Sequence, residues 1–476
     1  MAKRERWKKD FSIWFNEVLQ SADIMETRYP VKGLYVWLPH GLSLRNRALI
    51  ELRKLLEDNG HKEVLFPLLI PENLLKKESE HIRGFEGQVY WVTHGGRDKL
   101  DVKLALRPTS ETSMYPMFAL WIRSHADLPL KIYQVVNIFR YETKMTKPLI
   151  RLREVTTFKE AHTAHTTAEE AETQVKEAIK IYKKFFDHLS VPYVVTKRPP
   201  WDTFAGAHYS VAFDTLAPDG RTLQIGTIHN LGQNFAKVYG LTYETEGGKH
   251  QHVHQTCYGI SERAIASVIM IHGDDNGLCL PYNVAPTQVV VIPIPYKEKE
   301  APVGRTAIEV RRELNGAGFR VQIDDRDIRP GNKFYYWERR GVPLRIEIGP
   351  NDFENKQVIA VRRDTGEKLT IPRKLLTTKV KQILDKIGKN LKERAWKNFR
   401  DYVIDATDIE TAKDALKKRG IARLPWCGQE SCGKEIGEKT GGEVLGEELE
   451  NKPEPTSTCA ACSERAKINA LVAKTY

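Results

Sequence analysis

Side chains that could bind phosphate lie in residues 131–165, a stretch that alternates like two β-strands joined by a charged loop at 143–152. Side chains of a strand alternate between its two faces, so Arg140 and Glu142 share one face of the first strand. The second strand places an aromatic ring, a carboxylate and an imidazole on one face: Phe158, Glu160 and His162. Pairing of the two strands would bring these groups together beside Arg151 of the loop.

Such a surface could hold a nucleoside triphosphate. Arginine binds phosphate oxygens through paired hydrogen bonds, and an aromatic ring can stack on a base. An arginine within an apolar strand is costly to bury unless it is paired, because an unpaired charge loses its hydration. A solvated hairpin with a chance pair of arginine and glutamate is the alternative, and residues 139–142 alone do not decide between the two.

Four of the six cysteines form two closely spaced pairs: Cys427 and Cys432, then Cys459 and Cys462. This spacing predicts one structural zinc site, because zinc binds four cysteine sulfurs in a tetrahedron. Disulfides are the alternative, which a reducing compartment disfavours. Cys257 and Cys279 stand apart from these pairs, and we expect them to be small buried apolar side chains.

Length and charge restrict the class of protein. A chain of 476 residues predicts two to four domains. Lys and Arg together number 74 against 62 Asp and Glu, and the resulting net charge of +12 suits a polyanion such as RNA. The first residues lack the apolar segment of a signal peptide, and no apolar run approaches the roughly 18 residues of a membrane span. With so few cysteines, we expect a cytoplasmic protein without a membrane partner.

Periodicity predicts the elements that position these groups. We expect a helix at 11–22, a turn at 39–41, a helix at 42–58 and a strand ending at Pro67. Further on we expect a helix at 168–189, a strand at 191–196, and paired strands at 201–210 and 221–240. We expect Gln224, Thr227 and His229 near the end of the last strand, where glycines would let a ligand approach the backbone.

Three segments, in this order, resemble the signature motifs of the class II aminoacyl-tRNA synthetases. The helix and strand at 42–67 are similar to motif 1, Phe-Arg-Tyr-Glu at 139–142 to motif 2, and Tyr-Gly-Ile-Ser-Glu-Arg at 258–263 to motif 3. Arg263 would lie in the first turn of a helix, where the helix dipole disfavours a cation, which suggests a role outside that helix. Residues 324–334 and 341–349 resemble the anticodon-binding domain of prolyl-tRNA synthetases.

The chain is therefore identified as a member of the prolyl-tRNA synthetase family, of the archaeal and eukaryotic type. The resemblance implies an α+β fold, in which an antiparallel class II sheet is flanked by helices. It implies a catalytic domain at 1–284, an α/β anticodon-binding domain at 285–378, and a small α+β domain with the four-cysteine site at 379–476. It also implies a homodimer formed through motif 1.

The reaction implied is the attachment of L-proline to tRNA(Pro) through prolyl-adenylate, with ATP and Mg²⁺ as well as structural Zn²⁺. ATP would be bound by Arg140, Glu142, Arg151, Phe158, Gln224, Thr227, Ser261 and Arg263. Proline would be bound by Thr109, Glu111, Arg140, Glu160, His162 and His229. The catalytic residues would be Arg140 and Arg263. Anticodon bases would be read by Arg345, Glu347 and Arg363.

Two other functions stay open: a threonyl or seryl ligase of the same class, and a catalytically inactive tRNA-binding or regulatory paralogue. The three arginines of the expected ATP site argue against an inactive copy. Lys-Met-Thr-Lys at 144–147 and Pro-His-Gly-Leu at 39–42 resemble class I signatures, but class I enzymes place theirs on a Rossmann fold. The short distance between motifs 2 and 3 leaves no segment for an editing domain.

Overall fold

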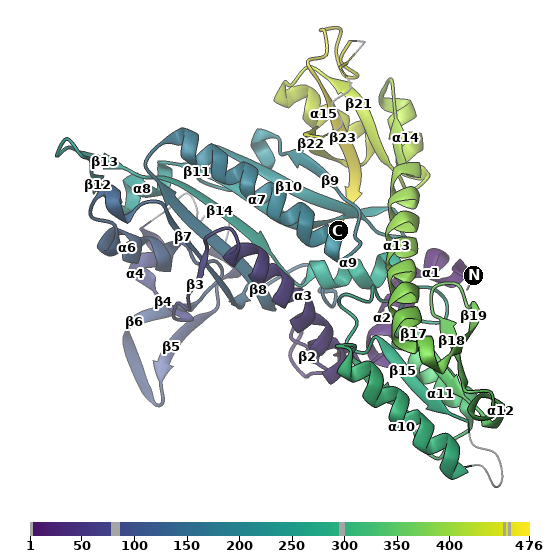
Figure 1. Cartoon of the computed structure of the whole chain (residues 1–476). Helices are drawn as coiled ribbons and strands as arrows, with labels where there is room; N and C mark the ends of the chain where they lie inside the picture. The colour runs from purple at the N-terminus through teal and green to yellow at the C-terminus, as the bar shows by residue number, and fades with distance from the viewer. Residues whose placement is uncertain (1–2, 78–85, 295–299, 451–453, 456–457) are drawn as a thin grey trace.

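The computed structural model describes residues 3–77, 86–294, 300–450, 454–455 and 458–476. A mixed sheet of eleven strands, largely antiparallel, runs through these residues (Figure 1). In spatial order its strands are β20 (Val403–Asp405), β21 (Ile421–Trp426), β23 (Ile468–Thr475), β22 (Glu443–Glu448), β9 (Val194–Lys197), β10 (Tyr209–Leu216), β11 (Arg221–Gly232), β14 (His254–Ile260), β8 (Glu154–His165), β7 (Leu130–Phe139) and β3 (Lys62–Glu63).

The expected hairpin is confirmed: β7 and β8 pair antiparallel, with Val136 opposite Phe158. The register shifts at Asn137, where this one residue of β7 faces two residues of β8, Thr156 and Thr157. Such a bulge increases the local twist and redirects the strand. Arg140 follows the end of β7 directly, so its side chain leaves the sheet at the edge of the loop.

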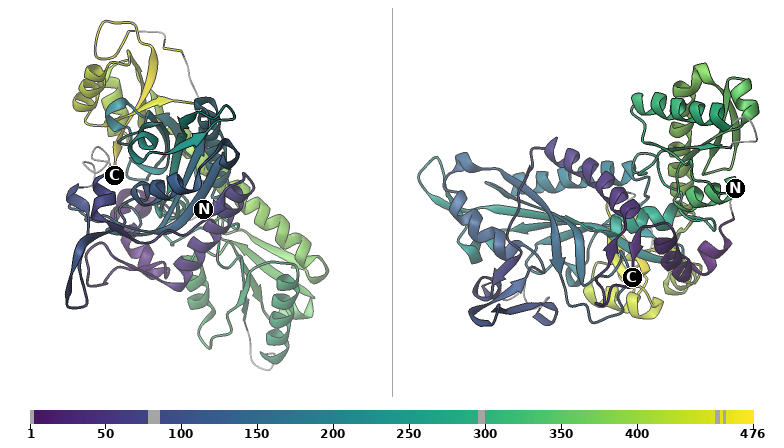
Figure 2. Two further views of the ribbon diagram at one scale, coloured as in Figure 1. Left: turned by 90° about the vertical axis from the view of Figure 1, so that its left-hand side faces the viewer. Right: turned by 90° about the horizontal axis from the view of Figure 1, so that it is seen from below.

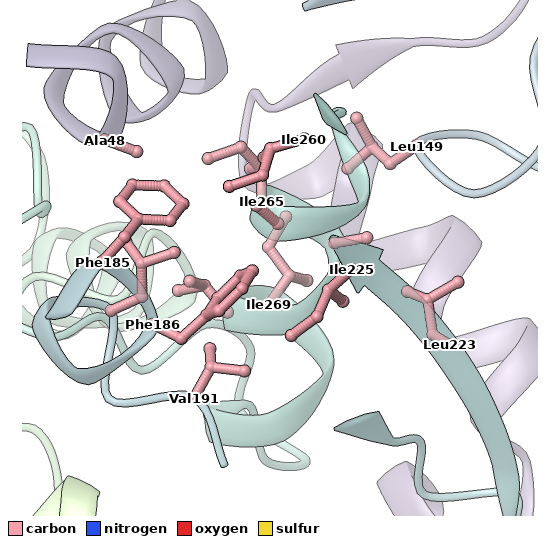
Figure 3. Close-up of a cluster of buried hydrophobic side chains, with 14 of the residues drawn as sticks. Ala48, Leu149, Phe185, Phe186, Val191, Leu223, Ile225, Ile260, Ile265 and Ile269 are labelled. Carbon is pink, nitrogen blue, oxygen red and sulfur yellow. The ribbon is translucent and has the colours of Figure 1, made fainter. Parts of the chain in front are cut away.

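Helices cover one face of the central strands. They are α3 (Pro39–Glu57), α7 (Ala168–His188) and α9 (Arg263–His272). On α7 apolar residues recur every three or four positions, so one stripe faces the sheet. Figure 3 shows Phe185 and Phe186 of α7 beside Ile265 and Ile269 of α9, with Ile225 of β11 completing the contact. Burial of each such side chain contributes about 1.5–3 kcal/mol.

The remaining elements of this part of the chain lie at its edges. They are α1 (Glu5–Lys9), α2 (Phe11–Ser21), β1 (Met25–Glu26), β2 (Val36–Trp37), β4 (Leu69–Pro71), α4 (Glu72–Lys76), η1 (Glu86–Gln88), β5 (Trp91–Gly95), β6 (Asp98–Leu106), α6 (Glu111–Trp121), η2 (His125–Asp127), η3 (Pro200–Asp202), α8 (Asn234–Tyr239), β12 (Thr242–Glu244) and β13 (His250–His252). Strands β4, β6 and β5 form a separate three-stranded sheet, which supports the start of α6.

A second unit has its own core and sheet, in the order β16 (Val321–Ile323), β15 (Val289–Pro293), β17 (Leu344–Ile348), β18 (Gln357–Arg362) and β19 (Lys368–Pro372). Strand β15 pairs parallel with β16 and β17, and β18 pairs antiparallel with both β17 and β19. The helices are α10 (Glu300–Gly316), α11 (Pro330–Arg339) and α12 (Pro350–Glu354), followed by η4 (Arg373–Leu375). This unit projects from one end of the large sheet and covers neither of its faces (Figure 2).

The last part of the chain extends the large sheet. It contains α13 (Leu376–Asp401), α14 (Ile409–Lys417), α15 (Glu430–Thr440) and strands β20 to β23. Strand β22 pairs with β9 and so adds the last four strands to the large sheet, and α13 runs beside this junction (Figure 1). At the junction Gly446 has φ +109°, and a Cβ there would lie 2.0 Å from the carbonyl oxygen of Lys197. Only glycine fits this position.

Four expected elements differ from the structure. The strand expected at 221–240 ends at Gly232, and Asn234–Tyr239 form the helix α8. The turn expected at 39–41 is the first turn of α3, because Pro39 takes the N1 position that suits its fixed φ. The strand ending at Pro67 is limited to Lys62–Glu63. The paired strand at 201–210 is mostly a 3₁₀ turn and loop, and β10 begins only at Tyr209. The expected limit at 378 lies within the first turn of α13, and the three-domain division remains our proposal.

Arg363 forms an ion pair between the first and second units. Its Nη1 and Nη2 each lie 2.6 Å from a carboxylate oxygen of Asp274, and its Nε donates to the carbonyl oxygen of Glu338 at 3.0 Å. Both charged side chains are buried. A buried guanidinium depends on its carboxylate, because removal of one partner leaves the other charge without compensation.

We therefore expect Asp274→Ala to lower the free energy of unfolding by about 3–5 kcal/mol. The matched control is Asp325→Ala, which removes an exposed carboxylate from the second unit and should cost no more than about 0.5 kcal/mol. Urea unfolding followed by tryptophan fluorescence measures both. Equal stability of Asp274→Ala and the wild type would show that this pair does not hold the two units together.

Candidate active site

A cavity of about 480 Å³ lies over the central strands, on the hairpin β7–β8 and its neighbours β10, β11 and β14. The structure brings every residue expected in the ATP and proline sites to its lining. These are Thr109, Glu111, Arg140, Glu142, Arg151, Phe158, Glu160, His162, Gln224, Thr227, His229, Ser261 and Arg263. Residues from five separate segments of the chain thus share one site.

Positive charge is concentrated at one end of this cavity. The Nε of Arg263 donates to the carbonyl oxygen of Ile150 at 2.9 Å, and its Nη1 to that of Gln224 at 3.3 Å. Burial, followed by the charges of Arg151 and Arg140, lowers the pKa of Arg263 to about 10. Burial also lowers the pKa of Arg140, whose Nε donates to the carbonyl oxygen of Pro108 at 3.1 Å. Three cations that repel one another in this way favour a polyanionic ligand.

The loop after β7 carries the third arginine and a carboxylate. Glu142 Oε2 lies 3.9 Å from Arg151 Nε, and Glu142 Oε1 accepts a hydrogen bond from the backbone N–H of Lys144 at 3.0 Å. Both side chains are partly exposed. Their contact is long for an ion pair, so a ligand can compete for the guanidinium.

Phe158 and Gly259 form part of the cavity floor. A Cβ on Gly259 would lie 3.4 Å from the Phe158 ring, so the glycine leaves this ring accessible. Gly226 also lines the cavity. A Cβ there would lie 3.0 Å from the Tyr182 ring, so its missing side chain makes room for α7 as well.

A bulge places Gln224 in the site. Strand β10 pairs Phe213 with Gly226 and Asp214 with Gln224, so Ile225 is the extra residue. Without a bulge, Gln224 and Thr227 would point to opposite faces of β11, because they are three positions apart. Both residues line the cavity. They lie within β11, whereas the sequence suggested a position near its end.

The other end of the cavity is rich in carboxylates. Thr109 Oγ1 donates to Glu111 Oε2, and Ser110 Oγ donates to Glu160 Oε1. Gln134 Nε2 also donates to Glu160 Oε1, at 2.9 Å. Burial of these carboxylates, each at most 3% exposed, is compensated by such donors.

Two imidazoles border the carboxylates. His162 Nε2 lies 3.4 Å from Glu160 Oε2, and its Nδ1 bonds the hydroxyl of Tyr115 at 3.0 Å. His229 bonds Ser210 Oγ through Nδ1 at 2.7 Å and stacks on Phe204, with ring centroids 4.6 Å apart. Hydrogen bonds thus fix the orientation of both rings.

Several residues of the site were not predicted. Ser110 and Gln134 hold Glu160, and Phe204 and Ser210 hold His229. Ser110 lies between Thr109 and Glu111, two residues expected to bind proline, and this position is the one signal that could have identified it. Phe204 belongs to the loop that was expected to be a strand, and no periodic pattern marks it. Glu262 also lines the cavity, and burial raises its pKa to about 7 while Thr156 donates two hydrogen bonds to it.

The four cysteines of the last unit form one cluster. Their sulfurs lie within 4.8 Å of one another, and those of Cys427 and Cys462 are 3.9 Å apart. Sulfurs at about 2.3 Å from a tetrahedral zinc ion would be about 3.8 Å apart. The cluster therefore fits a metal ion of this kind. All six cysteines are free thiols in the structure.

The three residues expected to read anticodon bases do not form one surface. Arg345 Nε donates to Glu347 Oε1 at 2.9 Å, and these two side chains lie on β17. Arg363 is buried in its ion pair with Asp274. Because that pair already uses both guanidinium Nη groups, we assign to Arg363 a role in holding the two units together and remove it from the base-reading residues.

Comparison with known proteins gives three matches along the chain. Residues 90–272 match the tRNA synthetase class II core domain (G, H, P, S and T), residues 288–383 an anticodon binding domain, and residues 409–476 the prolyl-tRNA synthetase C-terminal domain. Together with the antiparallel sheet and its arginine-lined cavity, these matches define a class II aminoacyl-tRNA synthetase.

Similarity to single proteins extends over the whole chain. The proline–tRNA ligase of Methanothermobacter thermautotrophicus is 55% identical, over 96% of this chain and 94% of its own length. That of Methanopyrus kandleri is 56% identical, over 98% and 96%. The chain also resembles the structure of the Giardia lamblia prolyl-tRNA synthetase in complex with prolyl-adenylate, with a TM-score of 0.95 and 37% identity over 100% of this chain and 99% of the other.

The chain belongs to the prolyl-tRNA synthetase family. Its activity is that of a proline–tRNA ligase, which attaches L-proline to tRNA. A structure from Cryptosporidium parvum with halofuginone and AMPPNP bound is similar as well, with a TM-score of 0.94 and 34% identity over 98% of each chain. In the described residues no helix has the length and apolar character needed to span a membrane.

Proposed function

We propose that the cavity forms prolyl-adenylate from L-proline and ATP and then transfers the prolyl group to tRNA(Pro). The observation that carries this proposal is a single cavity lined by both three arginines and two buried carboxylates. The proline carboxylate attacks the α-phosphate, pyrophosphate leaves, and the terminal ribose of the tRNA then attacks the acyl carbon. Alignment and charge neutralisation are the main demands of this chemistry.

We assign the nucleotide to the arginine end. Arg140 bridges the proline carboxylate and the α-phosphate, while Arg151 and Arg263 hold the β- and γ-phosphates. Phe158 and Arg263 enclose the adenine between a ring and a guanidinium, an arrangement that cation–π attraction favours. The remaining contacts come from Glu142, Gln224, Thr227 and Ser261. Mg²⁺, when bound with ATP, would neutralise phosphate charge and orient the leaving pyrophosphate.

We assign proline to the carboxylate end. Glu111 pairs with the secondary ammonium group, and Thr109 orients Glu111 through its hydroxyl. Glu160, His162 and His229 form the remaining polar wall. An exchange assay of ATP and pyrophosphate with a panel of amino acids tests this assignment, because activation of threonine or serine in place of proline would contradict it. Absence of exchange with every amino acid would favour an inactive paralogue.

Arg140 gives the sharpest test of the proposed chemistry. Arg140→Ala should lower the rate of adenylate formation by on the order of a hundredfold or more, as does the loss of a preorganised donor to developing charge. Arg140→Lys should not restore the rate, because an ammonium cannot make the two parallel hydrogen bonds of a guanidinium. Exchange at nearly the wild-type rate in either variant would exclude Arg140 from the mechanism.

We propose that the second unit binds the anticodon of tRNA(Pro), through Arg345 and Glu347 among other residues. The match of residues 288–383 to an anticodon binding domain and the net charge of +12 support this proposal. We also propose a cytoplasmic location, which the six free thiols favour.

We propose that the chain forms a homodimer. Apolar side chains are exposed on one side of α3, among them Leu42 and Ile50, and Leu65 is 81% exposed. Exposed apolar side chains that cluster on a surface mark interfaces. Sedimentation equilibrium should give the mass of two chains, and the mass of a single chain would contradict this proposal.

We propose that the four-cysteine cluster binds structural zinc. Metal analysis should then give about one equivalent per chain. Cys459→Ser should lower the melting temperature of the last unit more than it slows adenylate formation, because the cluster lies outside the cavity. A metal-free protein with an unchanged melting temperature would show that the site does not stabilise the fold.

A pocket for proline also has to reject alanine, which is smaller. Alanine lacks part of the proline ring, and missing methylene groups discriminate by only about 1–3 kcal/mol, or roughly 10- to 200-fold. Residues 166–253, all of which the structure describes, form α7 to β13 of the catalytic core, so they contain no separate editing domain. We therefore expect detectable activation of alanine and no hydrolysis of Ala-tRNA(Pro). Loss of preformed Ala-tRNA(Pro) well above the rate in buffer would reveal an editing site.

A further inference from the structure

A row of three side chains crosses neighbouring strands at the carboxylate end of the cavity. In the antiparallel register, Cys257 of β14 lies opposite His162 of β8 on one side and His229 of β11 on the other. Residues directly opposite each other point to the same face of a sheet, with Cβ atoms about 4.5–5.5 Å apart. Glu111, at the start of α6, faces this row, and its Oε1 lies 3.8 Å from the Cys257 sulfur.

Three of these residues could share a metal ion. Cys257, His162 and Glu111 offer a sulfur, a ring nitrogen and a carboxylate oxygen within 4.8 Å of one another. All three side chains are buried, at no more than 5% exposure, and all three line the cavity. Zinc bonds of about 2.3 Å to sulfur and about 2.0–2.2 Å to nitrogen and oxygen require donors roughly 3.3–3.7 Å apart. Small side-chain rotations would achieve this spacing.

Neighbouring residues already orient two of the three ligands. Tyr115 bonds His162 at Nδ1, at 3.0 Å, so Nε2, which lies 3.4 Å from Glu160 Oε2, is the ring nitrogen that would bind a metal in exchange for that contact. Thr109 bonds Glu111 at Oε2, so that Oε1 faces the sulfur. Metal-binding histidines commonly have their second ring nitrogen held in this way by an oxygen. His229 lies in the same row, but its Nδ1 bonds Ser210 and its ring stacks on Phe204.

We propose that Cys257, His162 and Glu111 form a second metal site, which binds a divalent ion of the zinc type in place of the proline ammonium group. The proposal rests on the proposed proline pocket, because Glu111 serves both ligands and the two exclude each other. Binding forms one metal–sulfur, one metal–nitrogen and one metal–oxygen bond, and the thiol proton passes to the buffer. Thiolate and imidazole select borderline ions such as Zn²⁺ and Co²⁺, whereas Mg²⁺ prefers oxygen ligands.

Cobalt is the probe for this site. The full chain is first loaded with one equivalent of zinc at the four-cysteine cluster, where zinc resists exchange because its affinity exceeds that of cobalt. Titration with Co²⁺ should then fill about one further site and produce a thiolate-to-cobalt absorption band. Cys257→Ala should lose the band, whereas Cys279→Ala, which removes the other cysteine outside the four-cysteine cluster, should retain it. A band that survives Cys257→Ala, or no binding to the wild type, would overturn the proposal.

Proline tests the mutual exclusion. Saturating proline should abolish the cobalt band, and Zn²⁺ should raise the KM for proline in the exchange assay without changing kcat. Tyr115→Phe, which removes the oxygen that orients His162, should weaken cobalt binding by about 10- to 100-fold. Cobalt binding that proline does not reduce would overturn the shared site. If the protein catalyses proline-dependent exchange of ATP and pyrophosphate but does not bind cobalt, the metal site is refuted and the proposed function stands. If it binds cobalt but shows no proline-dependent exchange, the proposed function of the cavity is refuted.

Discussion

The cavity depends on holding three arginines close together, with neutral groups orienting the most buried of them. Arg263 is oriented by the carbonyl oxygens of Ile150 and Gln224, which fix its guanidinium but carry no net charge. A carboxylate in their place would satisfy the guanidinium and also compete with phosphate. The depressed pKa of Arg263 records the energetic cost of this arrangement, which burial and the two other arginines impose. A triphosphate would relieve that cost, so binding energy is available where charge develops in the reaction.

The sheet makes this arrangement possible because its strands are staggered by bulges. The extra residue in β11 brings Gln224 and Thr227 to one face, and the shift between β7 and β8 sets the edge from which Arg140 emerges. A strictly regular sheet would place a side chain at every second position only. The helices on the opposite face give the strands a rigid support, since that face is filled by the core shown in Figure 3. The cavity floor is thus backed by closely packed apolar side chains.

Sequence reasoning succeeded where a function follows a simple period. Phe158, Glu160 and His162 alternate on one strand, and all three line the cavity as expected. It failed where the contact is distant in the chain and has no period, as with Phe204 against His229. Arg363 shows a third kind of failure. Its residue type suited a nucleic-acid contact, but only the structure shows that Asp274, 89 positions away, holds it in a buried ion pair.

The polarity of the cavity also determines how an amino acid can enter it. Free proline carries an ammonium group and a carboxylate, and the cavity offers Glu111 and Glu160 to the first group and Arg140 to the second. The favourable orientation directs the ammonium toward the carboxylates and the proline carboxylate toward Arg140, where the α-phosphate is also expected. The reverse orientation would place like charges together at both ends, which costs several kcal/mol in a partly dehydrated site. In the proposed binding mode, electrostatics would therefore align the attacking oxygen with the phosphorus before any shape recognition of the ring. The proposed metal site uses the same carboxylate Glu111, so under both proposals the amino acid and the ion would compete for one feature of the charge distribution.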